Sequence, residues 1–521
     1  MTDPQLPPVI QRMLQPDFYP HPVQDDIQLI QTHISYVLLT GDYAYKVKKP
    51  LNFGFLDYSS LEQRQHFCHE ELRLNQRGAP QIYLEVLPIT QADSAYELDG
   101  SGTAVEYTVR MRQFPQDTIL SRRFERGELS AELLERLAKV VADFHGRSPT
   151  NPEIRSYGQP HRVREAFDEN YEQTEAYIGG PQTQQQFDET RAYTDRFFAE
   201  KTDLFTARIQ QDRIRECHGD LHLNNICLWH DELMLFDCIE FNKPFRFVDV
   251  MFDIAYLVMD LEVGQRRDLS TRFLNAYVEQ TGDWDGLQVL PIYLSRQTYV
   301  RAKVTSFLLD DPGVSAAEKD RARERAALYY RLAWQYAQPQ QGQVILISGL
   351  SGAGKSTTAR HLAAQIGAIH IRSDAVRKHL AGLPLDQRGD DSLYTPAMSE
   401  KTYDRLLDLG LQLATAGYSV ILDAKYDRAQ RRLAVQTQAD AAGLPYRVLY
   451  CDAPAEVRRE RLQSRTGDVA DATADMVASQ QFEPFTAAEE PHVQRLDATQ
   501  PVEVQLGQLI QDCNSRSGMM P

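Results

Sequence analysis

The stretch Gly349-Leu350-Ser351-Gly352-Ala353-Gly354-Lys355-Ser356 decides the fold of the second half of this chain. It satisfies the pattern G-x-x-x-x-G-K-[ST] at every fixed position. In such a loop, glycines let successive backbone N–H groups turn inward around an anion, the lysine reaches the β and γ phosphates, and the following hydroxyl is a Mg²⁺ ligand. The stretch therefore predicts a phosphate-binding loop (P-loop).

The sequence on both sides of this loop fits the same interpretation. Residues 343–348 form a β-branched run that predicts a buried strand, and residues 357–364 predict a helix. The alternative, a glycine-rich turn with an unrelated lysine, does not explain this strand–loop–helix order. We expect ATP to be bound by the loop and the start of the helix: Gly349, Ser351, Gly352, Ala353, Gly354, Lys355, Ser356 and Thr357. We expect Ser356 to be a metal ligand as well.

Further β-prone runs alternate with helical stretches after the P-loop. A short strand that begins at Ala368 and ends in Ser373-Asp374 is expected, with further strands at 418–423 and 446–451 and helices at 398–416 and 427–442. This alternation predicts a parallel sheet that is covered by helices on both faces.

Two of these strands end in a carboxylate, at the edge of the sheet where ligands collect in α/β folds. Asp374 is expected to act as the base that orients an acceptor hydroxyl, although it is also placed to cap a helix. Asp423 has the position of a metal-associated carboxylate. Arg377, one helical turn after Asp374, is expected to hold an acidic substrate or the migrating phosphoryl group.

Arginines also crowd one helix near the end of the chain. Arg458, Arg461 and Arg465 recur at helical spacing, so three guanidinium groups can share one face. This pattern is typical of a solvated basic helix or, beside a P-loop, of an arginine lid that closes over ATP.

The P-loop together with Ser373-Asp374-x-x-Arg377 resembles the small P-loop kinases, a group that includes gluconate and shikimate kinases, polynucleotide 5′-hydroxyl kinases and zeta-type toxins. The resemblance implies that Lys355 and Ser356 bind nucleotide and Mg²⁺. It also implies that Asp374 is the acceptor base, that Asp423 supports the metal, and that Arg461 and Arg465 belong to the lid.

The first half opens with a hairpin signal. Residues 34–39 and 43–48 are β-prone runs separated by Thr40-Gly41-Asp42, and the second run contains Lys46 and Lys48. A helix is expected over residues 61–77, which carry Glu70 and Glu71. A strand is expected over 105–111 and a helix over 130–145.

A second group of chemical residues lies in His218-Gly219-Asp220-Leu221-His222-Leu223-Asn224-Asn225. Phosphoryl transfer to a hydroxyl needs a carboxylate for the hydroxyl proton and oxygen ligands for Mg²⁺. The catalytic loop of protein kinases supplies them as an Asp, an Asn five residues later, and a metal-binding Asp on the next hairpin. Asp220, Asn225 and Asp237 have this arrangement.

This stretch resembles the signature of the aminoglycoside phosphotransferase family, small-molecule relatives of the protein kinases. The resemblance implies that Asp220 is the catalytic base and that Asn225 and Asp237 are Mg²⁺ ligands. It makes Lys46 the lysine that binds the α and β phosphates, with Glu71 as its partner; Lys48 and Glu70 are the alternatives. No G-x-G-x-x-G precedes Lys46.

The resemblance also covers residues outside the catalytic positions. Residues 111–114 correspond to the hinge that contacts adenine, and Asp249 and Asp253 to structural aspartates.

Composition limits the class of protein and of substrate. The chain has 521 residues, 42% of them hydrophobic, and a net charge of −17, which disfavours long nucleic acid as a partner. The six cysteines contain no C-x-x-C pair, so reduced and mostly buried thiols are expected. No apolar run is long enough to cross a bilayer, and the start of the chain lacks a basic segment followed by an apolar one. A cytoplasmic protein without a membrane partner is expected; the sequence does not indicate its oligomeric state.

The predicted fold is an α+β protein-kinase-like domain followed by an α/β P-loop kinase domain with a parallel sheet covered by helices on both faces. We expect the first domain over 1–336, with a small lobe over 30–115 and a large lobe over 116–336. A linker over 337–342 and a second domain over 343–515 follow.

The leading functional hypothesis is a bifunctional kinase with two sites for ATP and Mg²⁺, each of which transfers a γ phosphate to a hydroxyl of a small molecule such as a sugar, nucleoside or cell-wall precursor. One alternative is a polynucleotide 5′-hydroxyl kinase, suggested by Ser373-Asp374-x-x-Arg377. The other is a regulatory protein that binds ATP without turnover.

Overall fold

The fold is taken from a computed structural model of the whole chain, which describes residues 6–23, 26–92, 95–464, 469–471 and 473–516. The chain divides into two compact units. The first contains residues 1–129, 143–166 and 205–260, and the second contains residues 130–142, 167–204 and 261–521.

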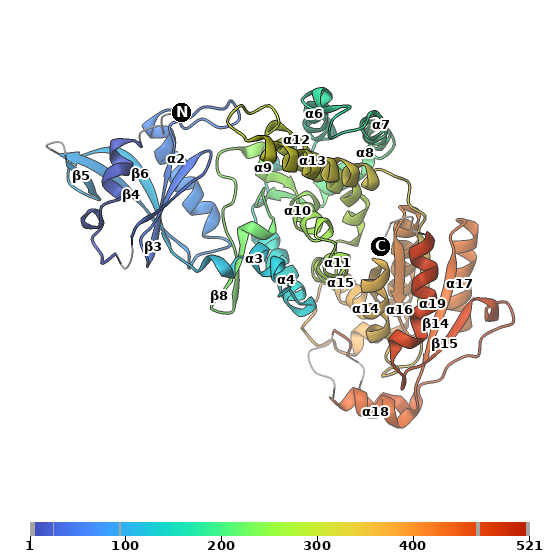
Figure 1. Cartoon of the computed structure of the whole chain (residues 1–521). Helices are drawn as coiled ribbons and strands as arrows, with labels where there is room; N and C mark the ends of the chain where they lie inside the picture. Colours follow the sequence, from blue (N-terminus) through green and yellow to red (C-terminus); the bar gives the residue numbers. More distant parts are fainter. Residues whose placement is uncertain (1–5, 24–25, 93–94, 465–468, 472, 517–521) are drawn as a thin grey trace. The chain divides into compact units, whose positions relative to one another are not determined.

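A six-stranded antiparallel sheet begins the first unit (Figure 1). Its strands in spatial order are β1 (Gln28–Gln31), β2 (Ser35–Leu39), β3 (Tyr43–Lys48), β6 (Thr103–Arg112), β4 (Tyr83–Ala92) and β5 (Ala95–Leu98). The predicted hairpin is confirmed, because β2 pairs with β3 across a turn in which Gly41 has φ 103°. Helix α2 (Leu61–Asn75), capped by Ser60, packs on β6 and β4.

The rest of the first unit carries the predicted catalytic loop. This loop lies between strand β7 and the hairpin of β8 and β9, and β7 pairs with β10. The elements are β7 (Ile214–Glu216), β8 (Ile226–Trp229), β9 (Glu232–Leu235), β10 (Phe247–Asp249), α1 (Pro8–Met13), α3 (Leu120–Glu125), α5 (Pro152–Ser156) and α9 (Lys243–Arg246). Four helices contribute residues to both units: α4 (Ala131–Arg147), α6 (Pro160–Glu172), α8 (Thr202–Gln210) and α10 (Val250–Val263).

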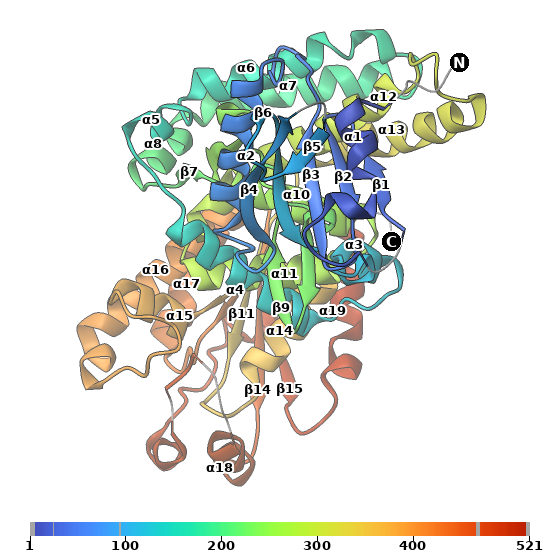
Figure 2. The ribbon, with the colours of Figure 1, turned by 90° about the vertical axis from the view of Figure 1, so that its left-hand side faces the viewer.

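The second unit contains a five-stranded parallel sheet (Figure 2). Its strands in spatial order are β12 (Ile369–Arg372), β13 (Ser419–Asp423), β11 (Gln343–Ser348), β14 (Tyr446–Asp452) and β15 (Val493–Asp497). The predicted parallel sheet is confirmed, and the strand that precedes the P-loop is central in it. The sequence analysis did not anticipate β15.

Helices cover both faces of this parallel sheet, as predicted. Helices α14 (Lys355–Ile366) and α19 (Val502–Arg516) share a hydrophobic core with Ile345 and Ile347. Helix α16 (Pro396–Thr415) packs against Leu422, whose neighbour Ile421 points to the α14 face. The remaining helices of this unit are α7 (Gln184–Glu200), α11 (Arg267–Thr281), α12 (Leu290–Phe307), α13 (Ala316–Tyr336), α15 (Ser373–Leu380), α17 (Ala429–Ala441) and α18 (Ala455–Ser464).

Helix α11 lies against the edge of the parallel sheet in the same unit. The side chain of Asn275 donates a hydrogen bond to the carbonyl of Ala368 (2.9 Å) and accepts one from the backbone N–H of His370 (2.8 Å). The carbonyl of Glu279 contacts the ring of His379 in α15 (2.7 Å). These contacts cover an otherwise unpaired strand edge and anchor the segment that carries Asp374.

The six cysteines are buried and free, as expected from the sequence. Among the described residues, no helix combines the length and apolar character that a membrane span requires.

We predict that Asn275→Ala lowers the free energy of unfolding by about 1–3 kcal/mol, because two backbone groups at the edge of β12 lose their partner. Urea denaturation of the full chain measures the change. Gln280→Ala on the same helix is the control and is expected to have little effect. An Asn275→Ala protein as stable as the control would show that these two hydrogen bonds do not hold the sheet edge.

Candidate active sites

The P-loop takes its shape from glycines that no other residue can replace without strain. Gly349 and Gly352 have φ values of 142° and 80°. A Cβ at Gly349 would lie 2.4 Å from the carbonyl oxygen of Cys451, and one at Gly352 would lie 2.6 Å from that of Arg458. Gly354 is the left-handed N-cap of α14, so the first backbone N–H groups of this helix point toward the loop.

Two side chains close this loop in the structure. The ammonium group of Lys355 donates a hydrogen bond to the carbonyl of Leu350 (3.1 Å), so it lies across the loop. The amide of Gln480 binds Ser351 twice: it donates to the hydroxyl (2.9 Å) and accepts from the backbone N–H (3.0 Å). The sequence analysis missed Gln480, because nothing in its local pattern connects it with a loop more than a hundred residues earlier.

The two carboxylates of this site have opposite electrostatic environments. Burial alone raises the pKa of Asp423, but its hydrogen bond with His370 (3.0 Å) and the charge of Lys355 hold that pKa well below its ordinary value. Burial raises the pKa of Asp374, and the charges of Arg372 and Arg377 oppose this shift only in part. Asp423 therefore stays ionised, as a metal ligand requires, while Asp374 has the greater affinity for a proton.

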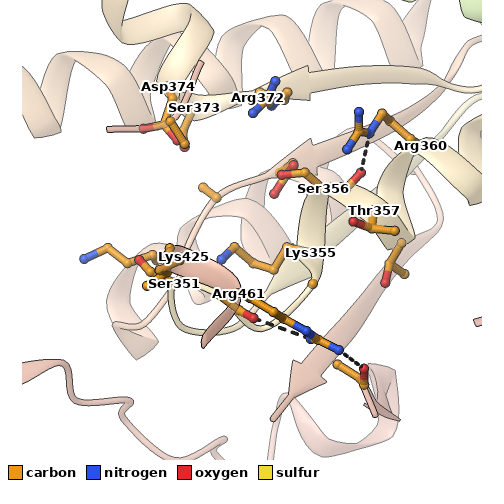
Figure 3. Close-up of a pocket in the computed structure, with 18 of the residues that line it drawn as sticks. Ser351, Lys355, Ser356, Thr357, Arg360, Arg372, Ser373, Asp374, Lys425 and Arg461 are labelled. Carbon is orange, nitrogen blue, oxygen red and sulfur yellow. Dashed lines mark hydrogen bonds between the residues drawn. The ribbon is translucent and has the colours of Figure 1, made fainter. Parts of the chain in front are cut away.

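A cavity of about 930 Å³ connects these groups (Figure 3). Lys355, Ser356 and Asp423 line this cavity, and so do Asp374 and Arg377. Thr357 and Ser351 also border the cavity. The structure thus brings together the P-loop and the predicted acceptor base and arginine.

The predicted lid arginines have mixed outcomes. Arg461 lines the cavity and donates to the carbonyl of Ala498 (2.7 Å). Arg458 is buried and does not border the cavity. Arg465 lies outside the described residues. Arg360, which the sequence analysis did not single out, borders the cavity and donates to the carbonyl of Ser356 (3.3 Å).

The predicted catalytic loop of the first unit is held by a buried carboxylate. Asp253 accepts hydrogen bonds from the backbone N–H groups of His218 (3.1 Å) and Gly219 (2.7 Å) and contacts the ring of His145 (2.9 Å). Gly219 has φ 86°, and a Cβ there would lie 2.9 Å from the carbonyl oxygen of Phe245. These contacts fit the predicted structural role of Asp253.

The predicted base, Asp220, has two neighbours that fix its orientation. The amide of Asn225 donates to its carbonyl oxygen (3.0 Å) and its carboxylate (3.3 Å). His222 accepts the backbone N–H of Asn224 at Nδ1 (3.2 Å), so Nε2 carries a proton and donates to Asp220 (3.2 Å). The sequence analysis quoted His222 within the motif without assigning it a role.

The predicted metal ligands lie next to each other in this unit. The backbone N–H of Phe236 donates to the carbonyl of Asn225 (3.0 Å), which places Asp237 beside the catalytic loop. Asp237 has φ 63°, a left-handed conformation that is rare for residues other than glycine. Its carboxylate is half-exposed, so it remains accessible to an ion.

Both candidate lysines contact one buried glutamate. The Glu71 carboxylate lies 2.7 Å from the ammonium groups of Lys46 and Lys48. Lys46 also contacts Asp237 (2.6 Å), whereas Lys48 is fully buried between Glu71 and Glu240. Only Lys46 therefore joins the glutamate to the predicted metal ligand.

Glu70 faces another group of residues and pairs with Arg73 (2.9 Å). The geometry favours Lys46 over Lys48 and Glu71 over Glu70 as the nucleotide-binding pair. Residues 111–114 lie nearby, where Phe114 packs edge-on against Phe236 with ring centroids 5.3 Å apart.

Both sites fit a nucleotide with Mg²⁺. In the second unit, the free N–H groups at the start of α14, Lys355, Ser356 and the ionised Asp423 match the phosphates and the ion. In the first unit, Lys46 suits phosphate oxygens, while Asn225 and Asp237 offer the hard oxygen ligands that Mg²⁺ prefers.

Two family models match the chain. The model described as "Phosphotransferase enzyme family" matches residues 63–290, and the model described as "AAA domain" matches residues 344–487. Together with the folds and sites described above, they define a chain in which a protein-kinase-like phosphotransferase domain precedes a P-loop kinase domain. The matches support kinase activity.

Sequence comparison then places the chain in a specific family. "Uncharacterized protein Rv2004c" of Mycobacterium tuberculosis (strain ATCC 25618 / H37Rv) is 32% identical over 470 residues, which cover 88% of this chain and 91% of that protein. The chain belongs to the same family as this relative.

Two partial similarities accompany this match. An adenylyl-sulfate kinase of Myxococcus xanthus (strain DK1622) is 33% identical over 120 residues, 22% of this chain and 60% of that enzyme. Among solved structures, the amicoumacin kinase hAmiN in complex with AMP-PNP, Ca²⁺ and Ami is 14% identical, with a TM-score of 0.38, over 60% of this chain and 89% of that one.

We predict that substitutions of Lys46 and Lys48 on β3 differ in their effects on stability and on ATP binding. Lys48→Met removes the cation from between two buried carboxylates and is expected to lower the free energy of unfolding by about 3–5 kcal/mol. Lys46→Met leaves Glu71 paired with Lys48, so it is expected to cost less stability but to weaken ATP binding. Urea denaturation and calorimetric titration measure the two effects.

The titration uses a Lys355→Ala background, so that only the site in the first unit contributes. Lys49→Met, at the neighbouring and partly exposed position that contacts neither Glu71 nor Asp237, is the control. Equal loss of ATP affinity in the Lys46 and Lys48 variants, at equal stability, would contradict the assignment of Lys46.

Proposed function

We propose that the chain is a bifunctional phosphotransferase that uses ATP and Mg²⁺ at two sites, each passing the γ phosphate to a hydroxyl of a small molecule. The observation that carries this proposal is the cavity of about 930 Å³ in which the P-loop and Asp374 share one space. A phosphate-binding loop alone would serve a binding protein. A partly buried carboxylate in the same cavity, Asp374, supplies the group that an acceptor hydroxyl needs.

At the P-loop site, the protein forms no covalent bond with the transferred phosphoryl group; it positions the reactants and accepts a proton. The acceptor oxygen forms a bond to the γ phosphorus, the bond from that phosphorus to the β–γ bridging oxygen breaks, the hydroxyl proton passes to Asp374, and ADP leaves. Lys355 and the N–H groups of α14 hold the phosphates in line. Ser356 and Asp423 would hold Mg²⁺, which would neutralise charge on the phosphates.

At the site in the first unit, Asp220 takes the acceptor proton. His222 and Asn225 orient its carboxylate, and Lys46 holds the phosphates while Glu71 fixes the position of Lys46. Asn225 and Asp237 supply the metal ligands. The γ phosphoryl group passes to the acceptor hydroxyl as at the P-loop site, with Asp220 as the proton acceptor.

We predict that Lys355→Ala abolishes nucleotide turnover at the P-loop site and that Asp220→Ala abolishes it at the other. The double variant is expected to retain less than about 1% of the label transfer from radioactive ATP to a deproteinised metabolite extract, because each loss removes a group that acts on the transition state. Each single variant is expected to lose a different labelled product. Unchanged labelling in the double variant would refute the proposal.

The raised pKa of Asp374 predicts a specific pH profile for the P-loop site. The base must be ionised, so kcat/KM is expected to rise with pH through the pKa of Asp374, which lies above the ordinary value of about 3.9. Arg372 lowers that pKa through its charge, so Arg372→Gln is expected to move the acidic limb to higher pH. Rates measured in an Asp220→Ala background between about pH 4 and pH 8 test this. If Arg372→Gln left the acidic limb of the kcat/KM profile at the same pH, Asp374 would not be the base.

A further inference from the structure

One peptide bond of the P-loop, between Leu350 and Ser351, is held on both of its sides. Its carbonyl oxygen accepts hydrogen bonds from the ammonium group of Lys355 (3.1 Å) and from the backbone N–H of Ala353 (3.1 Å). Its N–H donates to the side-chain oxygen of Gln480 (3.0 Å). Because this peptide is trans and planar, its C=O and N–H point in opposite directions. Lys355 and Gln480 therefore hold the same peptide from opposite sides.

The side chain of Gln480 is locked onto Ser351 by a second hydrogen bond. The NH₂ group of its amide donates to the hydroxyl of Ser351 (2.9 Å). The N–H of Ser351 is a donor only, so the other end of the amide, which faces it, is the oxygen. Two hydrogen bonds to one residue leave the amide of Gln480 little freedom to rotate, and the peptide that it holds is restrained in the same way.

The segment that carries Gln480 is itself firmly anchored. The guanidinium of Arg432, in helix α17, is fully buried; it donates to the carbonyl of Glu483 (3.1 Å) and pairs with Glu489 (2.6 Å). It also lies over the ring of Phe482, 4.9 Å from the ring centroid. These contacts tie the residues that follow Gln480 to α17, so Gln480 has a fixed position beside the P-loop.

The ammonium group of Lys355 depends on the carbonyl that this peptide offers. Among the described residues, the carbonyl of Leu350 is the one hydrogen-bond acceptor of this group. A lysine ammonium is a compact charge on a flexible four-carbon stem, so its position is set by the acceptors around it. If the peptide between Leu350 and Ser351 turned over, its N–H would face the ammonium in place of the carbonyl, and the two positive groups would repel each other.

We propose that Gln480 is a positioning residue of the P-loop site. By holding the N–H of Ser351, it keeps the carbonyl of Leu350 turned toward Lys355 and so sets the position of the lysine for the β and γ phosphates. The proposal rests on the kinase function proposed above. It gives a role in phosphate binding to a residue 129 positions after Ser351 that does not itself have to touch the nucleotide.

Calorimetric titration of the full chain with ATP tests this inference, in a Lys46→Met background so that the P-loop site alone contributes. Gln480→Met keeps the size of the side chain and removes both hydrogen bonds, so it is expected to weaken ATP binding about tenfold. Ser351→Ala keeps the N–H that Gln480 holds and is expected to weaken binding less. Gln481→Met, at the exposed neighbouring position outside the cavity, is the matched control and is expected to change nothing.

A double-variant cycle distinguishes action through Lys355 from direct contact with the phosphates. Lys355→Met is expected to weaken ATP binding strongly. Adding Gln480→Met to it is expected to change the affinity by less than about twofold, because the lysine that Gln480 positions is already absent. If the two losses multiplied, or if Gln480→Met alone bound ATP as the control does, the inference would be wrong while the kinase function stood. No ATP binding that depends on Lys355 would refute the function proposed for this site.

Turnover and stability give two further readouts. In an Asp220→Ala background, Gln480→Met is expected to slow label transfer from saturating radioactive ATP to the metabolite extract by about tenfold or more, since the lysine no longer meets the transition state. The midpoint of urea denaturation is expected to match that of Gln481→Met, because the anchor at Arg432 is intact. A lower midpoint for Gln480→Met would assign Gln480 to the support of the fold and contradict a positioning role.

Discussion

Both sites depend on a glycine that lies too close to a neighbouring carbonyl for any side chain. Gly349 turns the chain at the end of the central strand β11 where a Cβ would meet the carbonyl of Cys451. Gly219 does the same in the first unit against the carbonyl of Phe245. In each case the close approach directs the next backbone groups toward the place where chemistry is expected: the N–H groups of the P-loop in one unit and the carboxylate of Asp220 in the other. Two unrelated folds thus meet the same steric requirement in the same way.

Buried charge is handled differently in the two units. In the first, Glu71 is shared between Lys46 and Lys48, so one lysine holds the glutamate in place while the other extends to Asp237. In the second, Asp423 is kept ionised by His370 and Lys355, while Asp374 has a raised pKa. The first arrangement fixes the position of the cation that we propose binds phosphate. The second separates the proposed metal ligand, Asp423, from the proposed proton acceptor, Asp374. Lys46 and Lys48 are the same residue type, and so are Asp374 and Asp423. The two members of each pair differ only in which charged groups lie nearest to them.

The sequence was informative wherever a structure is determined by residues that are neighbours along the chain. The strand over 343–348, the turn at Gly41 and the spacing of Asp220 and Asn225 depend on neighbours a few residues away, and the structure reproduces the predicted strand and turn. The sequence could not reveal contacts between segments that are distant along the chain. Gln480 on the P-loop, Glu240 beside Lys48, and Asn275 at the edge of β12 lie far along the chain from the groups they contact. The alternatives for the lysine and the glutamate stayed open for the same reason, because periodicity alone does not say which of two neighbouring side chains faces inward.

The attachment of α11 to the edge of β12 has a consequence for the solubility of the second half of the chain. Helix α11 lies within the match to the phosphotransferase family, whereas the strand edge that it covers belongs to the P-loop half. A fragment that began at residue 343 would present a bare β-edge and the uncovered side of α14 to solvent, a surface prone to self-association. A chain divided between its two halves would leave the P-loop half without helix α11, and the exposed strand edge would make it prone to aggregation. The second half is therefore expected to be less soluble on its own than it is with helix α11 in place.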